Sequence, residues 1–328
     1  MVFLFRDKSI ANLFFLVVLS IAVHLHLFIN APLVVTNDAD GVFSILLRNY
    51  VVGLPTTVLF LLYHSIVLIQ AIRLNIVLND LRMFQHNTYT TAMAYVLLTG
   101  LFTQWCSITP ALLANFLLIW LFIKLCRLYN HPSPKTLLFN TGLIVGLSVL
   151  CYHPTAILVP VVLFALAVVR PFKLAEWLTL LMGALLPYYF LGAILFLKDQ
   201  FGSFSLYLPY LKLNLPMQQM DLPLVVSLSL LFIFLVTGLY YWQASSNRMV
   251  IQIRKNWGVM AVMLFILLLV PFLFQKAGLE AGLLLLVPLG AFAGNGFSYP
   301  RSLILPNILF WLTAGLIAYN NWWLVYYR

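Results

Sequence analysis

The chain has 328 residues, of which 63% are hydrophobic and only 8% are Asp, Glu, Lys or Arg. Soluble domains carry roughly 25% charged residues, and 18 basic and 8 acidic side chains are too few to cover a water-soluble fold of this length. The composition argues against a soluble enzyme, a nucleic-acid-binding module and a disordered chain, and it favours an integral membrane protein.

Long charge-free stretches run through the whole chain, and each one of sufficient length is a candidate membrane span. Nine of at least 20 residues occur, at 9–37, 49–72, 83–123, 136–169, 177–197, 222–247, 256–275, 281–300 and 302–327. The third and fourth are long enough for two helices each, because about 20 apolar residues cross a bilayer as a helix. The sequence therefore predicts an all-α fold, a polytopic transmembrane helical bundle with about 11 spans.

The expected spans can be given approximate bounds from the same pattern. They are 10–30, 55–76, 89–108, 111–127, 137–152, 154–170, 175–197, 223–243, 257–275, 281–298 and 303–325. No connection between them approaches the roughly 50 residues of a small domain. We therefore expect residues 1–328 to form a single integral membrane domain, with long outer loops at 30–54 and 199–223.

The distribution of basic residues predicts the orientation. With eleven spans and a cytoplasmic N-terminus, 13 of the 18 Lys and Arg residues lie on the cytoplasmic side, as short cytoplasmic loops require. If the two longest stretches were single spans, Lys124, Arg127 and Lys135 would all lie outside. The net charge of +10 is then a consequence of topology, and it requires no nucleic-acid partner. The expected location is the bacterial inner (cytoplasmic) membrane.

The first span and the cysteines have simple interpretations. The charged residues at 6–8 precede an apolar run that is too long for a signal peptide and lacks an A-x-A-like cleavage site, so we expect a retained span. Cys106, Cys126 and Cys151 lie in apolar stretches without a C-x-x-C spacing, which favours packing roles over disulfides or zinc.

Two carboxylates, Asp38 and Asp40, are the strongest catalytic candidates. They lie two residues apart just beyond the first span, followed by Gly41 and an expected short interfacial helix within 42–52. Such a pair suits a general base for an acceptor hydroxyl, or ligands for a divalent metal ion. The alternative is a solvated turn, because Asn, Asp and Gly are common turn residues.

The few basic residues on the outer side are candidates for binding an anion. Arg48 lies about two helical turns after Asp40, and Lys276 ends the ninth expected span, four residues before Glu280. A phosphate held at the outer surface would need such groups. The alternative for Lys276 is a surface ion pair with Glu280, which would contribute little to stability.

Of the histidines, His153 lies at an expected outer hairpin tip, where a phosphate or proton donor can reach it. His24 and His26 are two apart on an expected helix, so their side chains should diverge and be poorly placed to share a metal ion. A neutral, hydrogen-bonded imidazole is the alternative for each of them.

Four segments together resemble a known family. They are the acidic turn at 37–41, the stretch 78–110 with its terminal Pro, the hairpin 141–167, and the stretch 272–290, in which a Lys precedes a Leu- and Pro-containing span. In this order they resemble the polyprenyl-phosphate-sugar-dependent membrane glycosyltransferases of the GT-C type. The chain departs from that family in lacking an Asp-Glu pair and a soluble outer domain. It also resembles an uncharacterised family of Bacteroidota polytopic inner-membrane proteins.

The resemblance implies a GT-C-like fold and a role for each candidate. Asp38 or Asp40 would be the catalytic carboxylate, and Lys276 would contact the lipid phosphate, with His153 where some members have Lys. The implied function is transfer of a sugar from a polyprenyl-phosphate donor at the outer face. The implied partners are the lipid bilayer and the lipid-linked sugar.

Two other functions remain open. A non-enzymatic, multi-pass subunit or scaffold of a cell-envelope complex, such as secretion or motility machinery, would bind membrane-complex partners and need no catalytic carboxylate. A transporter would need charged residues deep in its spans, and the chain has few of them. The sequence does not identify a cofactor, although a divalent metal at Asp38 and Asp40 is compatible with it.

Overall fold

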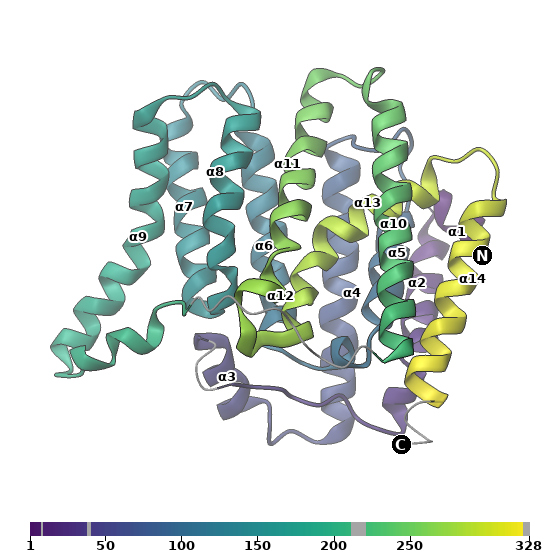
Figure 1. Ribbon diagram of the computed structural model, residues 1–328, viewed down its shortest axis with the longest axis horizontal. Coiled ribbons are helices and arrows are strands. Elements are labelled where there is room, and N and C mark those ends of the chain that lie inside the picture. Colours follow the sequence, from purple (N-terminus) through teal and green to yellow (C-terminus); the bar gives the residue numbers. More distant parts are fainter. Residues whose placement is uncertain (8, 38–40, 211–220, 324–328) are drawn as a thin grey trace.

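The computed structural model describes residues 1–7, 9–37, 41–210 and 221–323, and its regular secondary structure is helical apart from one isolated bridge. Figure 1 shows long helices standing side by side and joined by short connections at alternating ends. The all-α prediction is confirmed. The helices are α1 (Val2–Arg6), α2 (Ile10–Val23), α3 (Val42–Tyr50), α4 (Thr56–Asp80), α5 (Thr90–Thr99), α6 (Pro110–Arg127), α7 (Pro134–Cys151), α8 (Leu158–Val169), α9 (Leu174–Leu197), α10 (Leu222–Ser246), α11 (Ile251–Leu267), α12 (Val270–Leu273), α13 (Leu286–Ser298) and α14 (Ile304–Ala318).

Six shorter segments have other helical geometries. Five are 3-10 helices: η1 (Leu25–Phe28), η2 (Thr103–Cys106), η3 (His153–Ile157), η4 (Phe201–Tyr207) and η5 (Gln275–Leu285); the π-helix η6 (Tyr319–Trp323) follows α14. Local sequence sets several boundaries. Thr109 caps α6 by accepting a hydrogen bond from the Leu112 backbone N–H at 3.2 Å, and Pro110 occupies the first helical position, where its missing N–H has no cost.

Seven helical segments are long and apolar enough to cross a membrane. They are Thr56–Asp80, Pro110–Arg127, Pro134–Cys151, Leu174–Leu197, Leu222–Ser246, Ile251–Leu273 and Gly278–Ser298. Three shorter apolar segments, at 11–23, 90–99 and 153–169, run beside them. The protein is therefore a multi-pass membrane protein by length and composition.

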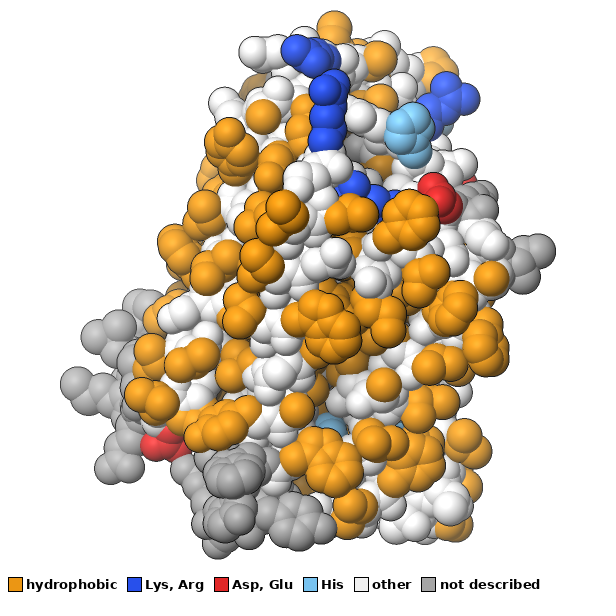
Figure 2. Space-filling model, turned by 90° about the vertical axis from the view of Figure 1, so that its right-hand side faces the viewer, with side chains coloured by type: hydrophobic (Ala, Val, Ile, Leu, Met, Phe, Trp, Pro, Cys, Tyr) orange, Lys and Arg blue, Asp and Glu red, His pale blue; other side chains and the backbone are white. Residues whose placement is uncertain are grey.

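The two ends of the bundle differ in charge. At one end, called here the basic end, lie α1 and the connections α4–α5, α6–α7, α8–α9, α10–α11 and α13–α14 (Figure 1). Figure 2 shows Lys and Arg side chains gathered at this end, above a broad band of hydrophobic side chains. The opposite end, called here the loop end, carries α3 and η4. This charge asymmetry agrees with the arrangement that the positive-inside rule predicts.

Helix α13 lies at the centre of the bundle, and its residues from Leu286 to Phe297 are all buried. Close backbone approaches fix it on two sides. A β-carbon at Gly238 of α10 would lie 2.5 Å from the Phe292 carbonyl oxygen, and one at Gly294 would lie 2.6 Å from Thr91 Oγ1 of α5. Small residues allow this approach, which is how helices pack in a membrane.

Several expected spans are not continuous α-helices, and three of them illustrate the breaks. The expected span 10–30 changes to 3-10 geometry after α2, the span 89–108 breaks between α5 and η2, and the span 281–298 begins in η5. Each break lies toward the loop end (Figure 1). Non-α backbone at membrane depth is tolerated where protein surrounds it or a cavity lies beside it. The α-helical geometry of these spans is therefore interrupted at the loop end of the bundle.

Candidate functional site

The connection between η1 and α4, described except for residues 38–40, is attached to the bundle at two places at the loop end. The first is a parallel bridge between Val34 and Ile108. The Val35 N–H donates to the Ile108 carbonyl at 3.1 Å, and the Ile108 N–H donates to the Leu33 carbonyl at 2.8 Å. The loop is thus fixed where η2 leads into α6, before it reaches the acidic turn.

The second attachment is Gly41, which closes the acidic turn. Its φ of +106° is strained for residues with a side chain, and a β-carbon there would lie 2.7 Å from the carbonyl oxygens of both Leu150 and Cys151. These carbonyls belong to the last turn of α7, and His153 follows two residues later. The sequence therefore needs glycine here to bring the end of the acidic turn against the start of η3.

Segment η5 packs on the other side of η2. The Trp105 indole N–H of η2 donates to the Leu279 carbonyl at 2.9 Å, and the Asn115 side chain of α6 donates to the Leu283 carbonyl at 2.9 Å. A β-carbon at Gly282 would lie 3.2 Å from the Trp105 ring. These contacts satisfy two backbone carbonyls of the 3-10 segment that carries residue 276.

The described flanks of the acidic turn, at 33–35 and Gly41, therefore lie around η2 and the end of α7 together with η3 and η5. His153 is buried in η3, and Arg48 is exposed on α3. Asp38 and Asp40 lie outside the described residues, and the same holds for the side chain of Lys276. How close the two carboxylates lie to Lys276 and His153 stays a prediction, as does the alternative pair between Lys276 and Glu280.

The helix that was expected to carry both His24 and His26 ends before them. Because α2 ends at Val23 and η1 follows, the two imidazole rings lie 6.5 Å apart, and the His64 ring of α4 lies 5.6 Å from that of His24. Within the described ranges, no three His, Cys, Asp or Glu side chains are grouped closely enough to hold a metal ion.

The buried His24 is the centre of a polar cluster that the sequence reasoning missed. Its Nδ1 lies 3.0 Å from the Ser20 carbonyl, and its Nε2 lies 3.2 Å from the Tyr63 hydroxyl and 3.3 Å from that of Thr99. In a neutral ring whose Nδ1–H donates to Ser20, Nε2 is a hydrogen-bond acceptor, and the Tyr63 and Thr99 hydroxyls beside it also donate to the carbonyls of Trp105 and Val96, at 3.1 and 2.7 Å. The cluster thereby connects α2, α4 and α5. The sequence did contain a signal for such a cluster, because polar His and Tyr side chains occur within stretches that are otherwise apolar.

The cysteines agree with packing roles. All three have free thiols; Cys106 and Cys126 are buried, and Cys151 is partly buried. The Cys106 thiol lies 3.6 Å from the Phe102 carbonyl, which is a weak local hydrogen bond.

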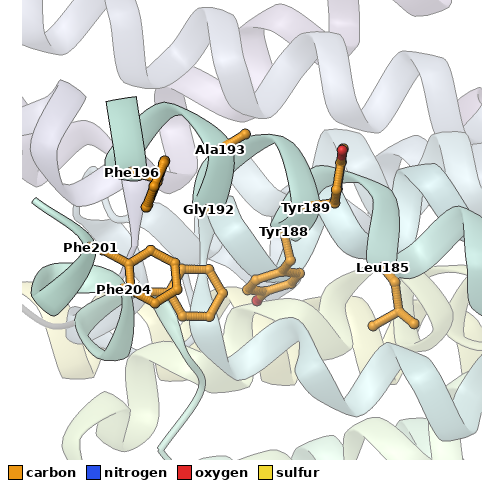
Figure 3. Close-up of a pocket in the computed structure, with 8 residues that line it drawn as sticks. All are labelled: Leu185, Tyr188, Tyr189, Gly192, Ala193, Phe196, Phe201 and Phe204. Carbon is orange, nitrogen blue, oxygen red and sulfur yellow. The ribbon is translucent and has the colours of Figure 1, made fainter. Parts of the chain in front are cut away.

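An apolar hollow of about 480 Å³ lies between α9 and η4 at the loop end. Figure 3 shows Phe201 and Phe204 of η4 lying beside Tyr188 of α9. The rings of Phe201 and Phe204 are stacked with centroids 5.7 Å apart. No charged residue is among those that line the hollow in the described part of the chain, so its chemistry suits hydrocarbon better than a polar reactant.

Searches with models of protein families, among curated proteins and among solved structures found no match to this chain.

Replacement of Gly41 by alanine is expected to move residue 41 and the following α3 away from α7, because the β-carbon would meet two backbone carbonyls and the φ of +106° would be strained. Limited proteolysis of the first outer loop should become faster, and any activity that depends on the acidic turn should be lost. Gly53→Ala is the matched control, since a β-carbon there has nothing within 4 Å. Equal proteolysis of the two variants would contradict the role of Gly41.

Proposed function

We propose that this multi-pass membrane protein is a glycosyltransferase of GT-C-like architecture that transfers a sugar from a polyprenyl-phosphate donor to an acceptor at the loop end. In this proposal the loop end faces the outer side of a bacterial inner membrane, and the N-terminus is cytoplasmic. The shorter helices α2, α5, α8 and α14 then also cross the membrane, which makes eleven spans in all.

The observation that supports this function best is the attachment of the first outer loop at Ile108 and Gly41. Through these contacts the ends of the acidic turn lie between η2, on which η5 packs, and the end of α7, from which η3 begins. We infer that the carboxylate pair between these ends, the imidazole carried by η3 and the basic residue carried by η5 border the same end of the bundle. A site for an anionic lipid and a hydroxyl acceptor needs this combination.

The proposed chemistry is a direct displacement at the anomeric carbon of the donor sugar. Asp38 or Asp40 accepts the proton of the acceptor hydroxyl, and the acceptor oxygen forms a bond to the anomeric carbon. The bond from that carbon to the phosphate oxygen breaks, and the polyprenyl phosphate leaves with the electron pair. Arg48, Lys276 and His153 would bind the phosphate and stabilise the charge that develops on it.

Replacing the two carboxylates tests the proposal. Asp38→Asn and Asp40→Asn, made singly and together, should lower sugar transfer about 10²–10⁴-fold if one of them is the general base. Transfer is measured with radiolabelled lipid-linked sugars in membranes, and by the glycan profile of cells that produce each variant. A further arm with a metal chelator shows whether a divalent ion is needed. Asp199→Asn is the control, because Asp199 follows α9 at the same end with a φ of 54°, which Asn accepts.

Unchanged glycan products in the double variant, with normal folding, would reject the enzyme. The alternative function, a subunit or scaffold of a cell-envelope complex, has one observation in its favour. Helix α9 has the smallest buried share of the seven candidate spans, and it leans away from the bundle toward the loop end (Figure 1). A scaffold would co-purify with partners that crosslink to the exposed Leu197, and the carboxylate variants would not affect this.

A further inference from the structure

A pocket of about 210 Å³ opens at the basic end, away from the candidate residues at the loop end. Three segments enclose it: the connection after α4, the turn between α10 and α11, and the last turn of α13. The side chains that matter for its chemistry are Arg82, His86, Arg248, Ser245, Asn295 and Tyr299. The proposed transfer at the loop end uses none of them.

The connection that forms one wall is held in place by hydrogen bonds. The side chains of Asn75 and Asn79 both donate to the Thr88 carbonyl, at 2.8 and 2.9 Å. The Trp257 indole N–H of α11 donates to the Met83 carbonyl at 3.1 Å. The wall is therefore fixed both to α4 and to α11 before any ligand binds, which lowers the entropic cost of binding.

Arg82 occupies a position that glycine usually takes. The Arg82 N–H donates to the Asn79 carbonyl at 2.9 Å and the Met83 N–H donates to the Leu78 carbonyl at 3.0 Å, which is the Schellman ending of a helix. Arg82 has the left-handed φ of 53° that this motif requires. An arginine is strained there where glycine is not, and it places a guanidinium in the lining of the pocket.

The lining of the pocket is basic. Arg82 and Arg248 are exposed at the rim together with His86, whereas Ser245 and Asn295 are buried. Ile253, in the first turn of the 17-residue helix α11, also lines the pocket, and no side chain caps this helix N-terminus. None of the described lining residues is acidic. Two guanidinium groups in the lining of one pocket form a binding site for an anion with several oxygens.

We propose that this pocket binds a phosphate group at the membrane surface of the basic end. The phosphate can belong to the headgroup of an anionic lipid in the adjacent leaflet or to a soluble phosphate ester, because both present the same oxygens to Arg82 and Arg248. Basic pockets between helices on this side of a membrane protein are suited to lipid headgroups. The proposal is independent of the sugar transfer proposed for the loop end.

The test compares the wild-type protein with the double variant Arg82→Gln, Arg248→Gln in nanodiscs. Both side chains are exposed, so the substitutions should not unfold the protein. Arg254→Gln is the matched control, since Arg254 is exposed on the first turns of α11 but does not line the pocket. Thermal stabilisation is measured with inorganic phosphate in phosphatidylcholine nanodiscs, and separately with phosphatidylglycerol added to the lipid.

The double variant is expected to lose tenfold or more in apparent affinity, on the order of what two charge-assisted hydrogen bonds contribute, and the control is expected to bind like the wild type. Stabilisation by inorganic phosphate alone would identify a soluble ester, and stabilisation by phosphatidylglycerol alone would identify a lipid headgroup. If both probes stabilise the wild type and the double variant equally, or stabilise neither, the proposal is wrong.

Gln85, an exposed residue of the same lining, provides a second test without loss of an arginine. Gln85→Glu adds a negative charge at the rim and should weaken phosphate binding, whereas Gln85→Lys should strengthen it. These opposite changes follow from charge. An identical affinity in both variants would overturn the assignment of the pocket even if the arginine variants behaved as expected.

Discussion

Gly142→Ala is expected to lower the stability of the protein, although alanine is the better helix former. A β-carbon at Gly142 of α7 would lie 2.0 Å from the Leu180 carbonyl oxygen of α9, and one at Gly183 of α9 would lie 2.2 Å from the Phe139 carbonyl oxygen. The helices must separate to admit a methyl group. Overpacking of this kind costs about 1–3 kcal/mol, and thermal unfolding in detergent will measure it.

The direction of the stability change distinguishes close helix packing from helix propensity. Gly315 lies in α14 with nothing within 4 Å of its β-carbon position, so Gly315→Ala should stabilise the protein by about 0.5–1 kcal/mol through helix propensity alone. Gly183→Ala should behave like Gly142→Ala. If both interface variants were as stable as Gly315→Ala, the packing of α7 on α9 would be incorrect.

The second large effect is expected for Arg170→Met. The Arg170 guanidinium binds Glu176 through two bonds of 3.0 and 3.2 Å, and it also donates to the carbonyls of Leu128 and His131. The side chains of Arg170 and Glu176 are only 14% and 7% exposed. Without Arg170, the Glu176 carboxylate would remain buried and unpaired, which costs about 3 kcal/mol. Thermal unfolding or resistance to denaturant gives the measurement.

A double-mutant cycle separates the pair from its surroundings. Arg170→Met together with Glu176→Met should recover much of the lost stability, because no unpaired charge remains. Lys173→Met serves as the control, since Lys173 is exposed in the same connection, and its effect should be within about 0.5 kcal/mol of zero. If the double variant were less stable than Arg170→Met, the ion pair would not be the main contribution of Arg170.

The positions of the long helices could be predicted because charge and hydropathy act locally. The expected spans 111–127, 175–197 and 223–243 correspond closely to α6, α9 and α10. A residue stretch that crosses a bilayer must be free of charge over about 20 consecutive positions. Each long span is therefore visible in the sequence without knowledge of its neighbours. The short helix expected after the acidic turn is likewise present as α3.

The breaks in the helices could not be predicted in the same way. The hydropathy of 281–298 is that of an ordinary span, yet η5 replaces its first part because Trp105 and Asn115 bind the carbonyls of Leu279 and Leu283. These partners lie 174 and 168 residues away in the sequence. Tertiary contacts therefore decide whether this segment is a 3-10 helix or an α-helix, and they override the helix propensity of its residues.

The sequence indicated which segments carry the candidate residues, but it did not indicate how those segments pack against one another. Residue type and position indicated the acidic turn and His153, whereas nothing local indicated that Gly41 would lie against the carbonyls of Leu150 and Cys151. For the packing of α7, a signal was available. Gly142 and Gly146 form the Gly-x-x-x-Gly spacing that lets membrane helices approach closely, and a β-carbon at Gly146 would lie 2.2 Å from the Ala184 carbonyl oxygen.

The central position of α13 has a consequence for biosynthesis. Its partner α5 ends at Thr99, whereas α13 begins only at Leu286, so roughly 190 residues are translated in between, which takes about 10–40 s at typical rates. During that interval the face of α5 that will contact α13 has no permanent partner. Among the described α-helices, only α14 is therefore synthesised after the innermost helix. The helices made before α13 must either separate when it inserts between them or stay loosely packed until then.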